Sequence, residues 1–128
     1  MNEKTGLGLE KLGAKMTDSD KKSQGRHTIA DAFMKDAQRE ATPWRSRADF
    51  AFEAVYLYAL SALGEDADNY AHPDARVLIA AAKKLGLTAV QIGPAVEYLQ
   101  HRYDSTIPDN GSAYRVLISI ATLLGAER

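Results

Sequence analysis

The chain has 128 residues, enough for one domain with a single hydrophobic core, and 45% of them are hydrophobic. Its 16 basic and 17 acidic residues leave a formal net charge of -1, without the cationic surplus typical of nucleic-acid and anionic-membrane proteins. Cysteine is absent, which excludes a disulfide framework and thiolate chemistry.

The N-terminal segment is polar and rich in glycine, and it includes the stretch TDSDKKSQG, which is typical of a solvated tail. We predict a flexible tail over residues 1–25 and a helical bundle domain over residues 26–128. No apolar run approaches the roughly 18 residues that span a bilayer, and no signal-peptide pattern is present. We therefore expect a cytoplasmic protein without a membrane partner.

The first helix is expected to begin near Thr28, where Thr28 and Asp31 resemble a capping box. It should end before Pro43, because proline disfavours helical geometry in the residue that precedes it. Ile29, Phe33 and Ala37 are predicted to line one apolar face, with Ala30 and Met34 alongside.

The second helix, from Pro43 to Leu63, is the longest uninterrupted helical pattern, and Gly64 is its expected end. One apolar stripe follows helical spacing: Phe52, Val55, Tyr56, Ala59, Leu60 and Leu63. The opposite side is largely apolar too, so we predict a central helix that other helices surround. Tyr56 and Tyr58 point to opposite sides, so at least one hydroxyl needs water or a partner.

Three further helices follow. The third is predicted from Pro73 to Leu85, with a buried face of Leu78, Ala81, Ala82 and Leu85. Thr88 and Gln91 form a capping box for the fourth, which Gly93 and Pro94 should interrupt before it continues to Tyr103. Its inward residues are predicted to be Val96, Leu99 and Tyr103.

The last helix is predicted from Ser112 to Leu124, with Leu117, Ile120, Ala121 and Leu124 buried. No strand pattern is present in the sequence. The predicted fold is therefore all-α: a single-domain, five-helix, up-and-down bundle with a disordered N-terminal tail.

Common catalytic and metal-binding motifs are missing, including HExxH, paired CxxC, the P-loop and the dinucleotide glycine fingerprint. We therefore predict no catalytic residue, no metal and no cofactor. His72 and Arg76 lie four residues apart at a helix start and are candidates to hold an anion. His101 is a further candidate, although a cation at a helix C-terminus also has a structural explanation.

The stretch AAAKKLGLTAVQIGPAVEYL is similar to a helix-turn-helix motif, with Ala82, Gly86 and Ile92 at the preferred spacing. This resemblance implies a DNA-binding regulator that uses residues 74–100, with Gln91 as the base-reading side chain. Pro94 and Glu97 depart from what groove readout needs.

Three segments resemble the HEPN family, small helical proteins of prokaryotic defence and toxin systems. ADFAFEAVYLYALSALG is similar to the long second helix of that family, EYLQHRYDSTIP to the segment that ends its fourth helix, and SAYRVLISIATLL to its last helix. The resemblance covers about residues 28–124. It implies a helical bundle, often dimeric, and many members are metal-independent ribonucleases.

The family's nuclease motif places a histidine four to six residues after an arginine, and this chain lacks it. Other members are partners of nucleotidyltransferases or nucleotide-binding adaptors. That role would need only a polar groove, which Arg47, Glu53, Tyr56 and Arg102 could supply.

Our leading hypothesis is a non-catalytic, HEPN-like binding or partner module, associated with a nucleotidyltransferase, a toxin or a defence system. We expect a homodimer and a protein partner, and we leave nucleic acid open. The first alternative is the helix-turn-helix regulator. The second is an atypical ribonuclease with its site at His101 and Arg102.

Overall fold

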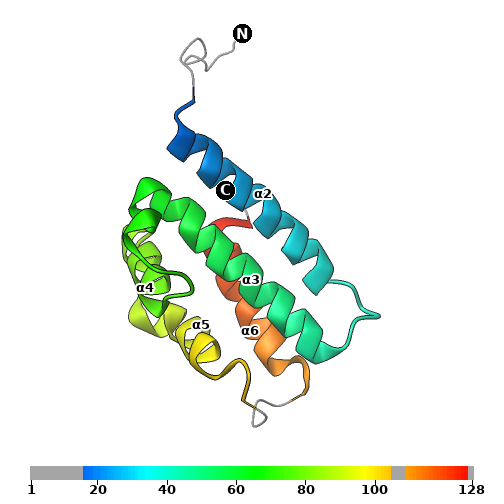
Figure 1. Cartoon of the computed structure of the whole chain (residues 1–128). Coiled ribbons are helices and arrows are strands. Elements are labelled where there is room, and N and C mark those ends of the chain that lie inside the picture. Colours follow the sequence, from blue (N-terminus) through cyan, green and yellow to red (C-terminus); the bar gives the residue numbers. More distant parts are fainter. Residues whose placement is uncertain (1–15, 105–108, 127–128) are drawn as a thin grey trace.

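The structure, a computed structural model, describes residues 16–104 and 109–126. These residues form one all-α domain with five α-helices and no strand, as predicted (Figure 1). The helices are α2 (Asp18–Ala37), α3 (Trp44–Leu63), α4 (Ala75–Lys84), α5 (Ala89–His101) and α6 (Gly111–Ala121). A 3-10 helix, η1 (Gly64–Asn69), follows α3, and a π-helical turn, η2 (Thr122–Ala126), follows α6.

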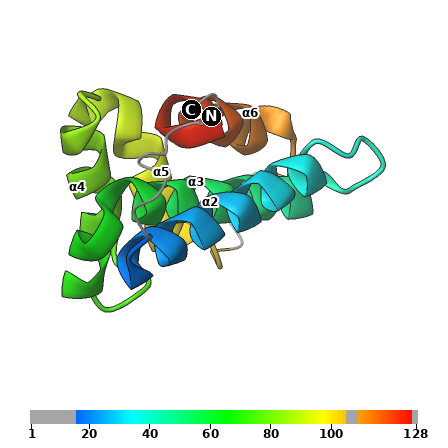
Figure 2. The ribbon, with the colours of Figure 1, turned by 90° about the horizontal axis from the view of Figure 1, so that it is seen from above.

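The helix α3 lies at the centre and contacts all four other α-helices. In Figure 1, α2 and α3 run side by side, and α4 and α5 cover another side of α3. Figure 2 shows α6 in a layer above the α2–α3 pair. This arrangement confirms the prediction of a central helix that its neighbours surround.

The predicted stripe of α3 is buried along its whole length: Phe52, Val55, Tyr56, Ala59, Leu60 and Leu63. Ala54 and Tyr58, on the other side of the helix, are buried as well. The chain's own helices therefore enclose α3, and its apolar surface needs no second copy to cover it. Gly64 ends the helix with φ = 62°, a left-handed conformation that favours glycine.

The start of α2 differs from the prediction by ten residues, because the helix begins at Asp18 and not near Thr28. Thr17 accepts the Asp20 N–H at 3.0 Å, and the Asp20 carboxylate accepts the Thr17 N–H at 3.3 Å, which completes a capping box. The Thr28 hydroxyl instead donates to the Gln24 carbonyl within the helix, at 3.0 Å. Residues 18–25, predicted as tail, are thus helical, and residues 1–15 lie outside the described part.

Two contacts fix this N-terminal part of α2 to the rest of the bundle. The Ser61 hydroxyl of α3 donates to the Ser23 carbonyl at 2.9 Å, and Lys22 Nζ lies 3.0 Å from Asp68 Oδ1 in η1. These long-range contacts explain why a polar segment with little helical signal of its own is helical here.

The predicted apolar faces of α2 and α5 were confirmed only in part, because one predicted residue of each is exposed. In α2 the buried residues are Ala30, Met34 and Ala37, whereas Ile29 is 52% exposed. In α5 the buried residues are Ile92, Ala95 and Tyr98, whereas Tyr103 lies beyond the helix and is 89% exposed. The α5 error follows from the predicted interruption, since the helix in fact runs without a break from Ala89 to His101 and includes Pro94.

The helix α4 begins two residues after Pro73, which lies before the N-cap and not inside the helix. Asp74 is the N-cap, and its carboxylate accepts the Arg76 N–H at 2.9 Å. Val77, Leu78, Ala81 and Ala82 form its buried face, which includes three of the four predicted residues. The fourth, Leu85, is only partly buried.

The C-terminal turn η2 packs against the centre of the bundle. Leu117, Ile120, Ala121 and Leu124 are buried, as predicted. A Cβ at Gly125 would lie 2.5 Å from Tyr58 Cδ1, so the turn approaches this ring more closely than a side chain allows. The ring nitrogen Nε2 of His27 in α2 donates to the Gly125 carbonyl at 3.1 Å. The end of the described chain is therefore tied to the first helix.

Candidate functional site

Three polar side chains follow one face of α3: Asp49, Glu53 and Tyr56, at the spacing i, i+4 and i+7. Each contacts a polar side chain from outside α3: Tyr98, Arg102 and His72, respectively. We call these six residues the polar seam. Four of them, Glu53, Tyr56, His72 and Arg102, are candidates from the sequence.

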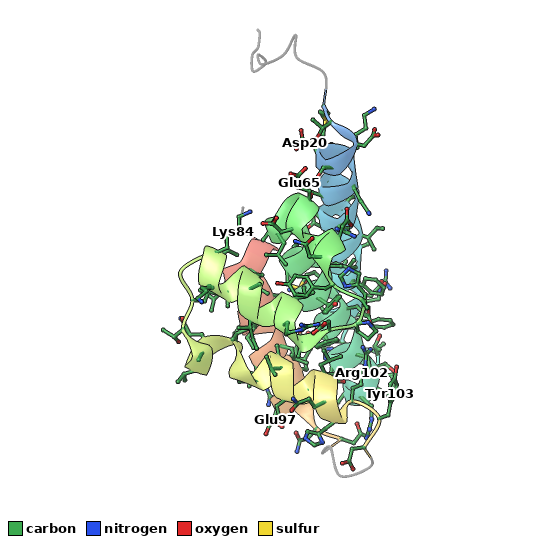
Figure 3. The ribbon with its side chains drawn as sticks, turned by 60° about the vertical axis from the view of Figure 1, so that its left-hand side comes forward. Asp20, Glu65, Lys84, Glu97, Arg102 and Tyr103 are labelled. Carbon is green, nitrogen blue, oxygen red and sulfur yellow. The ribbon has the colours of Figure 1, made fainter. Side chains whose placement is uncertain are left out.

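The ion pair between Arg102 and Glu53 joins the end of α5 to α3. Arg102 Nη2 donates to Glu53 Oε2 at 2.8 Å, and the Arg102 side chain is 14% exposed. Its guanidinium carbon lies 4.8 Å from the centre of the Phe52 ring. Burial acts to lower the pKa of Arg102, but the hydrogen bond and the charge of Glu53 raise it overall. Figure 3 shows Arg102 and the exposed Tyr103 side by side just after α5.

The Nε atom of Arg102 takes no part in the hydrogen bond with Glu53. Arg102 Nε is buried and has no hydrogen-bond partner in the part of the chain that the structure describes. The other polar contact of this region is the hydrogen bond from the Tyr98 hydroxyl to the Asp49 carboxylate. The Tyr98 ring also stacks on Phe52, with centroids 5.3 Å apart. Burial, and then the hydrogen bond to Asp49, raise the pKa of the Tyr98 hydroxyl well above its usual range.

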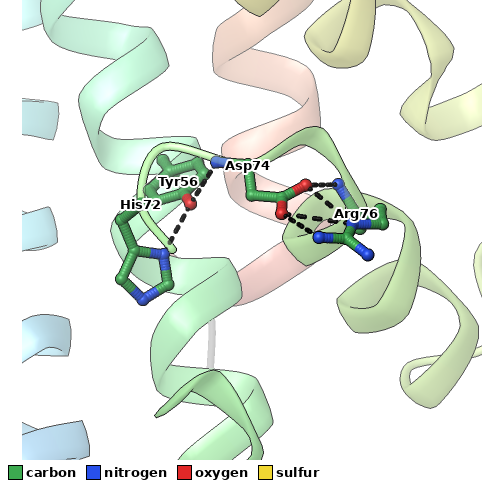
Figure 4. Close-up of polar contacts among 4 residues, drawn as sticks. All are labelled: Tyr56, His72, Asp74 and Arg76. Carbon is green, nitrogen blue, oxygen red and sulfur yellow. Dashed lines mark hydrogen bonds and ion pairs between the residues drawn. The ribbon is translucent and has the colours of Figure 1, made fainter. Parts of the chain in front are cut away.

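The second part of the seam holds the loop before α4 (Figure 4). The Tyr56 hydroxyl lies 2.8 Å from His72 Nδ1 and accepts the Asp74 N–H at 2.8 Å. The Asp74 carboxylate in turn binds the Arg76 guanidinium, with Nη2 2.7 Å from Oδ2. Arg76 holds the pKa of Asp74 below its usual range. His72 and Arg76 therefore do not converge on an anion, because Asp74 already binds the guanidinium.

Arg47 lies apart from the seam and does not belong to the polar groove that the resemblance implied. It is buried, and its Nε donates to the Ala37 carbonyl, at the last residue of α2, at 2.7 Å. The guanidinium carbon lies 4.5 Å from the ring centre of Trp44 and 4.3 Å from that of Tyr114. These contacts give Arg47 a structural role that joins α2, α3 and α6.

The two remaining candidates lie at the ends of α5. His101 is exposed, and its Nδ1 is 3.8 Å from Asp104 Oδ2. Gln91 forms the predicted capping box, since its Oε1 accepts the Thr88 N–H at 2.8 Å and its N–H donates to Thr88 Oγ1 at 3.1 Å. Its side chain therefore already serves the start of α5.

An open groove lies between α4 and α5, with a volume of about 760 Å³. Most of its lining is apolar: Ile79, Ala82, Leu87, Ala89, Ile92, Gly93, Pro94 and Val96. Three polar side chains also line it: Lys83, Glu97 and Gln100. Ile79 is 51% exposed, and nearby Val90, which precedes Pro94 by one turn of α5, is 85% exposed.

The sequence analysis missed Asp49, Tyr98 and the groove as parts of a site. Asp49 had a signal, because it precedes Glu53 by four residues on the same helical face. The groove had no such signal in the sequence, because we predicted that Val96, which lines the groove, faces the core.

Residues 16–104 and 109–126 provide neither a metal-ligand cluster nor a membrane-spanning helix. No group of three or more His, Cys, Asp or Glu side chains could hold a metal ion there. Within the same ranges, every helix is too short or too polar to cross a bilayer.

No family model, curated protein or solved structure matches this chain. The resemblance to the HEPN family therefore stays a prediction, and the functional argument depends on the geometry of this chain alone.

Proposed function

We propose that this chain is a non-catalytic helical binding module that contacts another protein through the groove between α4 and α5. The observation that carries this proposal is the groove itself, with a volume of about 760 Å³ and a mostly apolar lining. Grooves between helices that expose apolar side chains commonly receive an apolar helix face of a partner.

The character of the lining favours a protein over a small polar ligand. Small-molecule sites usually enclose their ligand and direct several polar groups at it. This groove is open, and its polar side chains are few: Lys83, Glu97 and Gln100. Ile79 of the lining is half exposed, and the exposed Val90, next to the lining residue Ala89, extends the apolar surface beyond the groove.

The polar seam supports this proposal in an indirect way. Its side chains bind one another, with Arg102 on Glu53 and Tyr98 on Asp49. Both pairs fix α5 against α3, and α5 forms one wall of the groove. The seam thus acts to position the wall of the binding surface and not to receive a ligand.

The proposal keeps the HEPN-like character and the association with a nucleotidyltransferase, a toxin or a defence system. Its support is the helical bundle around the aromatic helix α3, together with the sequence pattern described above. We also propose a cytoplasmic location, since a chain without cysteine suits a reducing compartment.

The two alternatives gain less from the structure. A DNA-binding regulator would need Gln91 to read a base, but the Gln91 amide oxygen already accepts the Thr88 N–H. An atypical ribonuclease would need Arg102 to reach RNA, but this guanidinium is paired with Glu53 and largely buried.

Site-specific photo-crosslinking of the full chain tests the proposal. A benzophenone amino acid replaces Val90 next to the groove or, as the control, the exposed Ile29 on α2, a helix that contributes no residue to the groove lining. Both variants are irradiated in the cells that naturally produce the protein. We expect one dominant protein adduct at position 90, identified by mass spectrometry, and none at position 29. Equal and weak labelling at both positions would contradict the proposal.

A further inference from the structure

We infer that the groove between α4 and α5 is occupied by the same surface of a second copy of this chain, in a two-fold symmetric dimer. This inference rests on the proposed function, because it names the partner of the same groove. The apolar surface of the central helix α3 is not available to form such a dimer. That surface is buried within one chain.

The first argument is the distribution of charge along the groove. Lys83 at the C-terminal end of α4 and Glu97 in α5 both line it. Figure 3 shows the neighbouring Lys84 at the end of α4 and Glu97 part-way along α5, well separated from each other. In a two-fold interface the same patch faces itself, so a positive end meets the negative end of the other copy. Lys83 of each copy would then pair with Glu97 of the other.

Second, Lys83 and Glu97 share the lack of an ion-pair partner within the part of the chain that the structure describes. Other charges of the bundle do, for example Arg102 with Glu53 and Arg76 with Asp74. A lysine and a glutamate that flank an apolar groove without local partners are suited to pair across an interface.

The third argument is the shape and apolarity of the surface. A groove between two helices accepts the ridge of side chains from another helix. Packing one α4–α5 hairpin against its copy would bury Ile79 and Val90 of both copies and place four helices around one apolar centre. The net charge of -1 per chain opposes this association only weakly.

A charge-reversal experiment tests the inference. Analytical ultracentrifugation of the full chain up to about 100 μM would detect a micromolar dimer as nearly complete association. Lys83→Glu and Glu97→Lys should each weaken self-association by about tenfold or more, because each places two like-charge contacts in the dimer. An equimolar mixture of the two variants should restore association, since every contact in the mixed dimer is attractive again.

Lys21→Glu is the matched control. Lys21 is an exposed lysine of α2, and its reversal changes the net charge as much as Lys83→Glu does. It should leave self-association unchanged. Circular dichroism of each variant checks that the helices remain.

Three outcomes would overturn the inference: a wild-type chain that stays monomeric, single variants that associate like wild type, or a mixture that associates no better than its components. These outcomes are separable from failure of the proposed function. A monomeric chain that still forms an adduct with a different protein at position 90 would overturn the dimer alone. Absence of any adduct at that position, a second copy included, would overturn both.

Discussion

The side of the bundle formed by α2, α3 and α6 and the hairpin of α4 and α5 use their apolar residues in different ways. On the first side, small residues such as Ala37 and Ala51 are fully buried and let the helices approach closely. The buried Arg47 and Tyr58 fill the space that remains. In the hairpin, one row of α4 is buried, including Leu78, while its neighbour Ile79 is half exposed beside the groove.

Substitutions in the two regions should therefore have different effects, on stability in the first region and on binding in the second. Apolar surface between α2, α3 and α6 is already buried within one chain, so changes there should act on the free energy of unfolding. Apolar surface beside the groove is still exposed, so changes there should act on association. Four main substitutions, three of them with a comparison variant, follow in order of decreasing expected effect of the main substitution.

Arg47→Ala should lower the free energy of unfolding by about 3 kcal/mol, because it removes a buried hydrogen bond and two aromatic contacts. The lost partners are the Ala37 carbonyl, Trp44 and Tyr114. Chemical denaturation followed by circular dichroism measures the change. Arg39→Ala is the control, since this exposed arginine pairs with Asp36 on the surface, and it should cost less than about 0.5 kcal/mol. Similar losses for both arginines would contradict the structural role of Arg47.

Gly125→Ala should cost about 2 kcal/mol, because the added methyl group overlaps the Tyr58 ring and the packing must shift. Gly93→Ala gives the opposite expectation. Its Cβ would meet no heavy atom within 4 Å, and alanine favours the helix by roughly 0.5–1 kcal/mol. Thermal unfolding of the two variants should therefore move in opposite directions. A stable Gly125→Ala protein would show that η2 does not pack on Tyr58.

Tyr98→Phe should cost about 1 kcal/mol at neutral pH through loss of the hydrogen bond to Asp49. The folded-state pKa of Tyr98 is raised above the ordinary value of 10.0, so its contribution is complete below pH 10. As the pH rises above 10, the unfolded chain loses the proton first, and the contribution declines. The difference between wild type and Tyr98→Phe should therefore shrink when unfolding is measured at pH 10.5. A difference that stays constant with pH would contradict this account.

Ile79→Ser should change the free energy of unfolding by less than about 1 kcal/mol, because the side chain is already half exposed. Its neighbour Leu78 is the internal control: it is fully buried, and Leu78→Ala should cost about 2–5 kcal/mol. Denaturant titrations of this adjacent pair show directly which row of α4 faces the core. Both variants are measured at a protein concentration at which the chain is monomeric, and a large loss for Ile79→Ser there would mean that the groove is not open to solvent.

The sequence predicted best where local signals and tertiary packing agree. The apolar stripe of α3, the end of that helix at Gly64 and the capping box of Thr88 with Gln91 were all confirmed. The start of α2 was missed because residues 18–25 are polar and include a glycine. What holds them in a helix is contact with Ser61 and Asp68, tens of residues away.

The sequence predicted several single residues of the site, but not how these residues pair. Glu53, Tyr56, His72 and Arg102 were recognised as candidates, but no sequence signal shows that Arg102 binds Glu53 across 49 positions. Arg47 was grouped with them, although its contacts with Ala37 and Tyr114 place it on another face of α3. The groove was missed because Pro94 suggested an interrupted helix, and α5 continues through it.

The hydrogen bond between His27 and Gly125 joins residues that are 98 positions apart. During translation, α2 and α3 can pair soon after they leave the ribosome, and Tyr58 then contacts His27 and Asp31 of α2. The side of the Tyr58 ring that faces Gly125 stays uncovered until η2 has been synthesised. A nascent chain that pauses before this point would therefore expose an aromatic surface, which is the kind of surface that chaperones recognise. The hydrogen bond between His27 of α2 and Gly125 can therefore form only after residue 125 has been synthesised.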